Sequence, residues 1–268
     1  MLSDFDAPQA FQVDQENGTY YVSNVNGDPS AKDGNGYISK INASGSPVIQ
    51  RFIGGKPAEP LLHAPKGIAI LGKDLFVTDI DAVKVFDKLS GKLVATIDFT
   101  DKGAKFLNDI ASDSAGLLYI SDISANKIFK MNPNKNYDIV LFKEGKELGG
   151  PDGLAVNPKS KDLMVVTWTS GQILEIGRKT GKIHILKRGL TKLDGIDYDN
   201  DGNLYVSSFE KGEIYKIPHF GRGLLTTYLS GLVTPADISY DRKREELLIP
   251  SFKGNTVTTV PNPAKKKT

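Results

Sequence analysis

The chain has 268 residues, and its 34 basic and 32 acidic side chains leave a net charge of only +2. This balance does not indicate nucleic-acid binding, and no run of 18 apolar residues predicts a membrane span. The chain contains no cysteine, which excludes disulfides, zinc–thiolate centres and cysteine nucleophiles. The length suits one large all-β domain or two small domains.

A repeated pattern of about 42 residues organises the chain. Each copy starts with a small or acidic residue followed by an apolar one, and continues with a strand, a turn and a second strand. The first copy is degenerate, and the other five follow one another at nearly constant spacing. The starting residues in chain order are Ala10, Gly67, Asp109, Gly153, Gly195 and Asp237.

The third copy displays the internal order of strands most clearly. Residues 110–113 predict a short strand, and a turn over 114–116 leads into a β-rich strand over 117–122. Polar–apolar alternation over 127–131 and a further run over 137–142 predict two more strands. Four short strands per repeat of about 40 residues are typical of a propeller blade.

The last copy contains only three predicted strands, over 237–240, 246–250 and 256–260. We expect residues 2–5 to supply its outer strand, which would join the two chain ends and remove an open sheet edge. No helical period competes with the strands. We therefore predict an all-β, six-bladed β-propeller with four-stranded antiparallel blades as a single domain over residues 1–262. A disordered basic tail is expected over 263–268.

One mouth of the central channel is the candidate functional site, because the residues that open the innermost strands of all blades meet there. In the six copies this position holds Gln9, Lys66, Asn108, Asp152, Asp194 and Ala236. Four of these side chains offer oxygen atoms and two are acidic, which suits a hard divalent cation. The alternative is structural, since Asp and Asn also stabilise turns and strand entries.

Three other features are open to two interpretations. Trp168, the only tryptophan, either lines a pocket or packs between blades. The loop over residues 25–36 is either a lid over the mouth or an ordinary surface loop. Among the three histidines only His63, three residues before Lys66, is a candidate pocket residue. Residues 197–202 are similar to the start of an EF-hand loop, but Ser208 stands where the twelfth residue would be Glu, so we interpret them as a turn.

Motifs at the starts of three copies carry a family likeness. They read Asn108-Asp109-Ile110, Pro151-Asp152-Gly153-Leu154 and Leu193-Asp194-Gly195-Ile196. With them, most of the chain resembles the SMP-30/gluconolactonase/LRE-like six-bladed propellers. A looser similarity links it to NHL-type, strictosidine-synthase-like and paraoxonase-type propellers.

This resemblance implies one divalent cation at the channel mouth, held by Glu, Asn, Asn and Asp. Asn108 and Asp194 match two of these positions, whereas Asp152 stands in place of Asn and Gln9 in place of Glu. The two departures cancel in charge, so the resemblance still implies metal binding. The expected cation is calcium, with magnesium, manganese or zinc as alternatives.

The resemblance also implies a metal-dependent hydrolase of a lactone or related ester, similar to a gluconolactonase. Asp194 would be the catalytic general base. From its position at the mouth, Lys66 either binds an anionic or hydroxylated substrate or is an ordinary turn lysine, and His63 and Trp168 are the other candidate substrate-binding residues. The alternative is a non-catalytic propeller that binds a ligand or a protein partner, with or without a structural metal, because a propeller fold hosts many functions.

We expect a monomer that takes a small-molecule substrate or ligand. Residues 1–6 lack the pattern of a signal peptide. Because similar bacterial sequences are often exported, we expect a periplasmic or secreted protein whose signal is absent from this numbering. A cytoplasmic location is the alternative, and the lack of cysteine agrees with either compartment.

Overall fold

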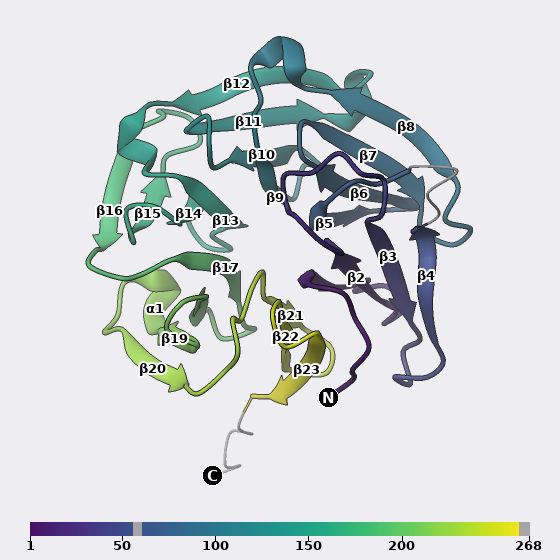
Figure 1. Ribbon diagram of the computed structural model, residues 1–268. Coiled ribbons are helices and arrows are strands. Elements are labelled where there is room, and N and C mark those ends of the chain that lie inside the picture. Colours follow the sequence, from purple (N-terminus) through teal and green to yellow (C-terminus); the bar gives the residue numbers. More distant parts are fainter. Residues whose placement is uncertain (56–60, 263–268) are drawn as a thin grey trace.

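Each sequence repeat folds into an antiparallel meander, because short β-branched and aromatic runs alternate with turns rich in Gly, Asp and Asn. The computed structural model describes residues 1–55 and 61–262. Within these residues, six sheets surround a central channel as the blades of a propeller (Figure 1). The predicted six-bladed β-propeller is thereby confirmed.

The first three blades follow one another along the chain. Blade 1 contains β1 (Pro8–Val13), β2 (Tyr20–Asn24), β3 (Tyr37–Ile41) and β4 (Val48–Gly54). Blade 2 contains β5 (Pro65–Leu71), β6 (Asp74–Asp79), β7 (Ala82–Asp87) and β8 (Leu93–Asp98). Blade 3 contains β9 (Leu107–Ser112), β10 (Leu118–Asp122), β11 (Lys127–Asn132) and β12 (Asp138–Glu144).

The other three blades complete the ring. Blade 4 contains β13 (Pro151–Val156), β14 (Leu163–Thr167), β15 (Ile173–Ile176) and β16 (Ile183–Lys187). Blade 5 contains β17 (Leu193–Tyr198), β18 (Leu204–Ser208), β19 (Glu213–Ile217) and β20 (Thr226–Leu229). Blade 6 contains β21 (Ser239–Asp241), β22 (Glu246–Ser251) and β23 (Thr256–Pro261).

The apolar core forms a ring around the channel. In the described part of the chain, one cluster of buried apolar side chains lies between each pair of adjacent blades. Between blades 2 and 3, for example, Phe99 and Phe129 pack edge to face with ring centroids 5.3 Å apart. The packing surfaces therefore lie between the blades.

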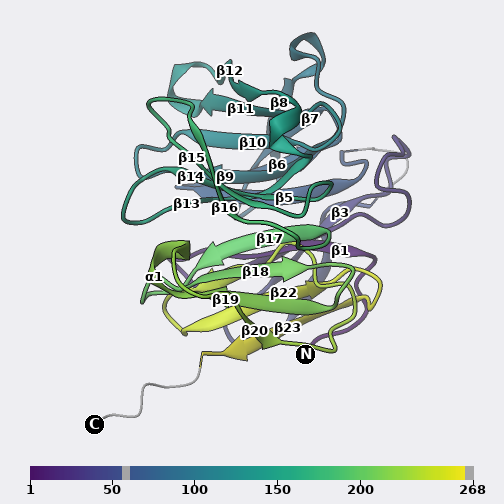
Figure 2. The same ribbon diagram turned by 90° about the vertical axis from the view of Figure 1, so that its left-hand side faces the viewer.

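The N-terminal segment completes blade 6, as the sequence predicts. Leu2 pairs with Val257 of β23 in antiparallel fashion, through N···O distances of 2.9 and 3.0 Å. Phe5 is buried in the cluster between blades 6 and 1. The two chain ends therefore meet in one sheet, and Figure 2 shows the N-terminus beside β23.

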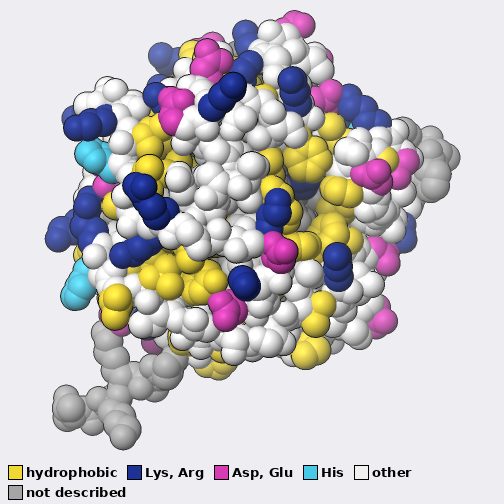
Figure 3. Space-filling model, turned by 60° about the vertical axis from the view of Figure 1, so that its left-hand side comes forward, with side chains coloured by type: hydrophobic (Ala, Val, Ile, Leu, Met, Phe, Trp, Pro, Cys, Tyr) yellow, Lys and Arg dark blue, Asp and Glu magenta, His cyan; other side chains and the backbone are white. Residues whose placement is uncertain are grey.

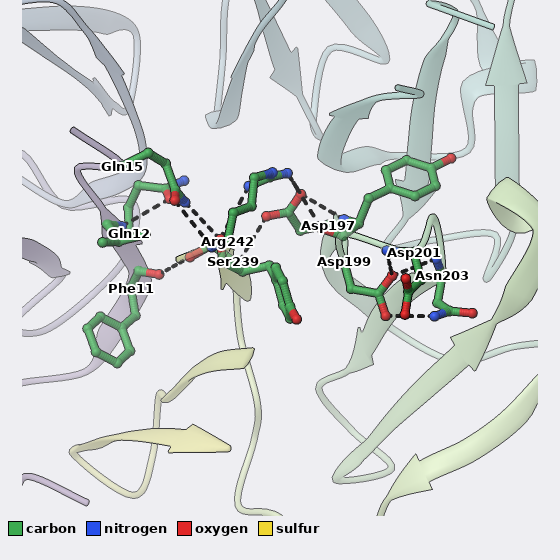
Figure 4. Close-up of polar contacts among 12 residues, drawn as sticks. Phe11, Gln12, Gln15, Asp197, Asp199, Asp201, Asn203, Ser239 and Arg242 are labelled. Atoms are coloured by element: carbon green, nitrogen blue, oxygen red, sulfur yellow. Dashed lines mark hydrogen bonds and ion pairs between the residues drawn. The ribbon is translucent and has the colours of Figure 1, made fainter. Parts of the chain in front are cut away.

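Polar contacts also close the ring, at the end of the channel opposite the candidate site (Figure 4). Asp197 of blade 5 accepts hydrogen bonds from the Tyr240 main-chain nitrogen at 2.8 Å and from Arg242 Nη2 at 3.0 Å. Gln15 of blade 1 donates to the Tyr240 carbonyl at 2.8 Å and accepts from the Arg242 nitrogen at 3.2 Å. Blade 6 is therefore tied to both of its neighbours.

Residues 199–203 form a turn, as expected for the segment similar to an EF-hand start. Asp199 Oδ1 accepts from the main-chain nitrogens of Asp201 and Asn203 at 2.9 and 2.8 Å, and Asp199 Oδ2 accepts from Asn203 Nδ2 at 2.7 Å (Figure 4). The Asp199 carboxylate thus holds the hairpin between β17 and β18.

Helical structure in the described residues is limited to short segments. They are α1 (Pro218–Gly221) and the single turns η1 (Thr100–Lys102), η2 (Pro133–Lys135) and η3 (Lys146–Leu148). In α1, His219 and Phe220 have left-handed φ values of 57°, so this segment is a turn in practice. Among the described residues, no helix has the length and apolar character to span a bilayer. The predicted tail over 263–268 lies outside the described residues.

Candidate functional site

The second residue of the innermost strand brings polar side chains together at one mouth of the channel. Blades 1 to 5 each place a polar residue there, whereas blade 6 has Ala236, just ahead of β21. A pocket of about 370 Å³ at this mouth is lined by all five. They are Gln9, Lys66, Asn108, Asp152 and Asp194, and each is buried.

A β-bulge at the start of each innermost strand orients these side chains. In blade 4, Pro151 pairs with Thr167 and Leu154 pairs with Val165. The chain therefore advances three residues along β13 but only two along β14 between these pairs. The same shift occurs between the first two strands of blades 1, 2, 3 and 5. Because a bulge inserts one extra residue, the second and third residues of the strand both turn away from the regular pleat.

Buried serines compensate for hydrogen bonds that the bulges interrupt. The main-chain nitrogen of the third residue donates to a serine hydroxyl on the adjacent strand in three blades. These bonds are Ala10 N to Ser23 Oγ at 2.9 Å, Asp109 N to Ser121 Oγ at 2.9 Å and Gly195 N to Ser207 Oγ at 2.7 Å. The recurring Ser in the second strand, as in Val-Ser-Asn and Ile-Ser-Asp, is the sequence signal of this support, which the repeat analysis missed.

The acidic side chains on the pocket floor are paired with amides. Gln9 Nε2 donates to Asp194 Oδ1 at 3.1 Å, and Asn108 Nδ2 donates to Asp152 Oδ1. The second oxygen of Asp152, Oδ2, is buried without a hydrogen-bond partner. An unsatisfied buried carboxylate oxygen is costly, so Asp152 needs a proton, a ligand or a cation.

The two carboxyls resist ionisation. Burial raises the pKa of Asp152 well above its ordinary value, and the negative charges of Asp194, Asp109 and Asp237 raise it further. Burial likewise raises the pKa of Asp194, with a further contribution from Asp109, while the hydrogen bond from Gln9 opposes the shift. Asp109 and Asp237 each follow a floor position by one residue in the sequence. Together with Asp152 and Asp194 they place four carboxyl groups close to one another in the channel near this mouth.

Lys66 places a cation on the same floor. Its Nζ donates to the main-chain oxygens of Pro29 and Ala64, both at 2.9 Å, and lies 4.4 Å from the ring centroid of Phe106. Burial lowers the pKa of Lys66 to about 8, while Asp79, Asp152 and Asp28 oppose the shift. Lys66 is therefore a charged group at neutral pH that loses its proton more easily than an exposed lysine.

The wall of the pocket is aromatic. Trp168 and Phe209 pack edge to face with centroids 5.3 Å apart, and Phe209 packs the same way on Phe252 at 5.7 Å. All three of these side chains line the pocket, and so does Phe106. Trp168 thus both lines the pocket and packs between blades, and Lys192 lies over its ring at 4.9 Å.

His63 does not line this pocket. Its Nδ1 accepts a hydrogen bond from the Gly34 nitrogen at 3.1 Å, and its main-chain oxygen accepts one from the Gly36 nitrogen at 3.1 Å. His63 therefore supports the loop over residues 25–36, which passes in front of β5 and β9 in Figure 1. Because Pro29 of this loop lines the pocket and accepts from Lys66, the loop borders the mouth.

The donor set on the floor fits a hard divalent cation. Gln9, Asn108, Asp152 and Asp194 offer only oxygens once the two amides turn over, and Asp152 Oδ2 already lacks a partner. In the described residues, no group of three or more His, Cys, Asp or Glu side chains is arranged to hold a metal. A cation on the floor would therefore require the amide oxygens of Gln9 and Asn108.

A second cavity, also of about 370 Å³, lies at the other end of the channel. At its rim, Lys88 Nζ forms an ion pair with Asp14 Oδ2 at 2.7 Å, and Arg242 pairs with Asp197 at 3.0 Å. These charges are already paired in contacts between blades, so the mouth around Asp152 remains the candidate functional site.

No protein-family model and no curated protein sequence matches the chain. Solved structures are similar in fold. A catalytically inactive virginiamycin B lyase from Staphylococcus aureus, solved with quinupristin, is 16% identical with a TM-score of 0.67 over 96% of each chain. A streptogramin B lyase is 14% identical with a TM-score of 0.65 over 97% of this chain and 96% of that one.

A further neighbour is a Bacteroides thetaiotaomicron protein of unknown function, 15% identical with a TM-score of 0.72 over 94% of this chain and 68% of that one. At identities this low, these neighbours establish the propeller fold alone.

Proposed function

We propose that the pocket around Asp152 and Asp194 is the active site of a hydrolase that opens a lactone or a related ester and that requires a divalent cation. The observation that carries the proposal is the buried Asp152 Oδ2, which has no hydrogen-bond partner. The motif resemblance to gluconolactonase-like propellers and the fold likeness to two lyases favour an enzyme over a structural protein.

Gln9, Asn108, Asp152 and Asp194 would hold the cation, and calcium suits a set of four oxygen donors. A bound cation would supply a Lewis acid for the carbonyl oxygen of the substrate. It would also neutralise the two carboxylates, whose burial opposes ionisation.

Asp194 would act as the general base. Its carboxylate takes a proton from water as the water oxygen bonds to the acyl carbon, and the bond from that carbon to the ring oxygen breaks. The departing oxygen takes up the proton that Asp194 accepted, which leaves a hydroxy acid and restores the carboxylate. Lys66 holds two main-chain oxygens, and the third donor of its ammonium group is available to a substrate oxygen.

One observation favours the second candidate, a ligand-binding propeller without catalysis. Both amides donate to the carboxylates, Gln9 to Asp194 and Asn108 to Asp152. Each carboxylate then has one oxygen that accepts an amide hydrogen bond, so two of the four oxygens would need no cation if this arrangement persisted with a ligand bound. The aromatic wall serves a binding protein as well as an enzyme.

Turnover of lactones with and without chelator separates the two candidates. The panel includes dihydrocoumarin, a γ-butyrolactone and glucono-δ-lactone, with Asp194→Asn as the base-deficient variant and Asp162→Asn, outside the pocket, as the matched control. We expect hydrolysis that chelation and Asp194→Asn abolish and that Asp162→Asn retains. Hydrolysis that persists in Asp194→Asn, or none by the calcium-loaded protein, contradicts the proposal.

A further inference from the structure

A collar of apolar side chains surrounds the polar floor. In all six blades the residue that follows the second strand is apolar. These residues are Val25, Ile80, Ile123, Trp168, Phe209 and Phe252. Because the second strands all end at the same mouth, the six side chains form one ring above the floor residues.

The collar is exposed to the pocket on one side of the mouth only. Val25 and Ile80, from blades 1 and 2, are buried together with Ala64. The four members from blades 3 to 6 line the pocket. Three of those four are the contiguous aromatic rings of Trp168, Phe209 and Phe252.

Few polar groups lie on this wall. Among the described residues that line the pocket, polar atoms are carried by the five floor side chains, by Ser124 and by the indole nitrogen of Trp168. A sugar lactone carries several hydroxyl groups, and each hydroxyl buried against aromatic rings without a hydrogen-bond partner weakens binding. The wall therefore disfavours a polyhydroxylated ligand, whereas a flat apolar ring fits against it.

The size of the pocket and the patchy apolar surface favour a small ligand over a protein partner. On the face seen in Figure 3, apolar side chains form separate patches bordered by Lys, Arg, Asp and Glu. Contiguous apolar surface is the usual mark of a protein-binding face. A pocket of about 370 Å³ is in the range that small molecules occupy.

We infer that the substrate is a lactone or ester that carries an aromatic or other apolar ring, and is not a sugar lactone. The substrate class rests on the proposed function, but the binding preference does not, because it follows from the wall alone. The ring lies against Trp168 and Phe209, and the acyl group faces the floor.

Trp168 provides a direct readout, since it is the only tryptophan in the chain. We would titrate dihydrocoumarin and glucono-δ-lactone into the full chain in the Asp194→Asn background, and follow tryptophan fluorescence. Dihydrocoumarin should quench saturably, and glucono-δ-lactone should bind on the order of 100-fold more weakly. Phe209→Ala should weaken dihydrocoumarin binding about tenfold.

Matched variants separate wall contacts from loss of folding. Phe209→Leu keeps an apolar side chain but removes the ring, and should also weaken binding. Phe142→Ala removes a ring that packs edge to face on Tyr119 in blade 3 at 5.1 Å, outside the pocket, and should leave the titration unchanged. Glucono-δ-lactone binding as tight as dihydrocoumarin binding, or no effect of either Phe209 variant, overturns the inference.

The two proposals fail separately. If dihydrocoumarin quenches Trp168 but the calcium-loaded chain hydrolyses no lactone, the preference for apolar rings stands and the hydrolase proposal falls. If glucono-δ-lactone is hydrolysed and dihydrocoumarin does not bind, the hydrolase proposal stands and the preference for apolar rings falls.

Discussion

Replacing Asp152 by asparagine should stabilise the cation-free protein and destabilise the calcium-loaded one relative to wild type. Without a cation, the ionised Asp152 leaves Oδ2 buried and unpartnered. Asparagine has nearly the same shape, and it leaves a neutral amide nitrogen at this position in place of a charged oxygen, so the gain comes from removing the buried charge. With a cation, the same oxygen is a ligand, so its loss removes binding energy.

The size of the effect follows from the structure. An unsatisfied buried group costs about 1–3 kcal/mol, more if charged. In a protein of 268 residues, each kcal/mol shifts Tm by roughly 2–4 °C. We therefore expect Asp152→Asn to raise Tm by roughly 2–12 °C at about pH 8 without cation. Calcium at about 100 times its Kd should stabilise wild type by about 2.7 kcal/mol and reverse the order.

Differential scanning calorimetry of both proteins, with chelator and with calcium, measures this crossing. The gain without cation should vanish near pH 4, because burial raises the pKa of Asp152 and the protonated wild-type side chain is uncharged there. A lower Tm for Asp152→Asn in chelator at pH 8 would refute the reasoning, since it would mean that Lys66 already compensates the Asp152 charge.

Three further outcomes are expected. Ser207→Ala should lower the free energy of unfolding by about 1–3 kcal/mol in urea titrations, because Gly195 N and Ala236 O lose their partner; an equal loss in Ser30→Ala, an exposed serine, would argue against the bulge account. Phe5→Ala should cost about 3–5 kcal/mol, since Phe5 is buried between blades 6 and 1; an unchanged Tm contradicts closure by the N-terminal segment. Burial raises the pKa of Asp109 to about 6, so its contribution to stability is full below about pH 4 and is lost as pH rises through 6, by roughly 3 kcal/mol; chelated protein with stability flat from pH 4 to 7 contradicts this.

The sequence repeat predicted most of the fold. Spacing alone placed the innermost strands, and with them the ring of Gln9, Lys66, Asn108, Asp152 and Asp194, because equivalent positions of a closed repeat must meet around one axis. The role of residues 2–5 also followed, since blade 6 lacks an outer strand and an open edge is unfavourable.

Other features depend on contacts that a repeat does not specify. His63 precedes Lys66 by three residues, but its side chain accepts a hydrogen bond from the Gly34 nitrogen and does not line the pocket. The role of Trp168 required its neighbours, because the same sequence position is buried in blades 1 and 2 and open to the pocket in blades 3 to 6. The missing partner of Asp152 Oδ2 is a property of packing that only the structure reveals.

The most direct test of a cation-dependent site at the channel mouth is calorimetric titration of calcium into the chelator-treated full chain and into its Asp194→Asn variant. The account predicts one calcium ion bound per wild-type chain and binding at least about tenfold weaker in the variant. Absence of binding at millimolar calcium, or equal binding by the variant, would contradict it.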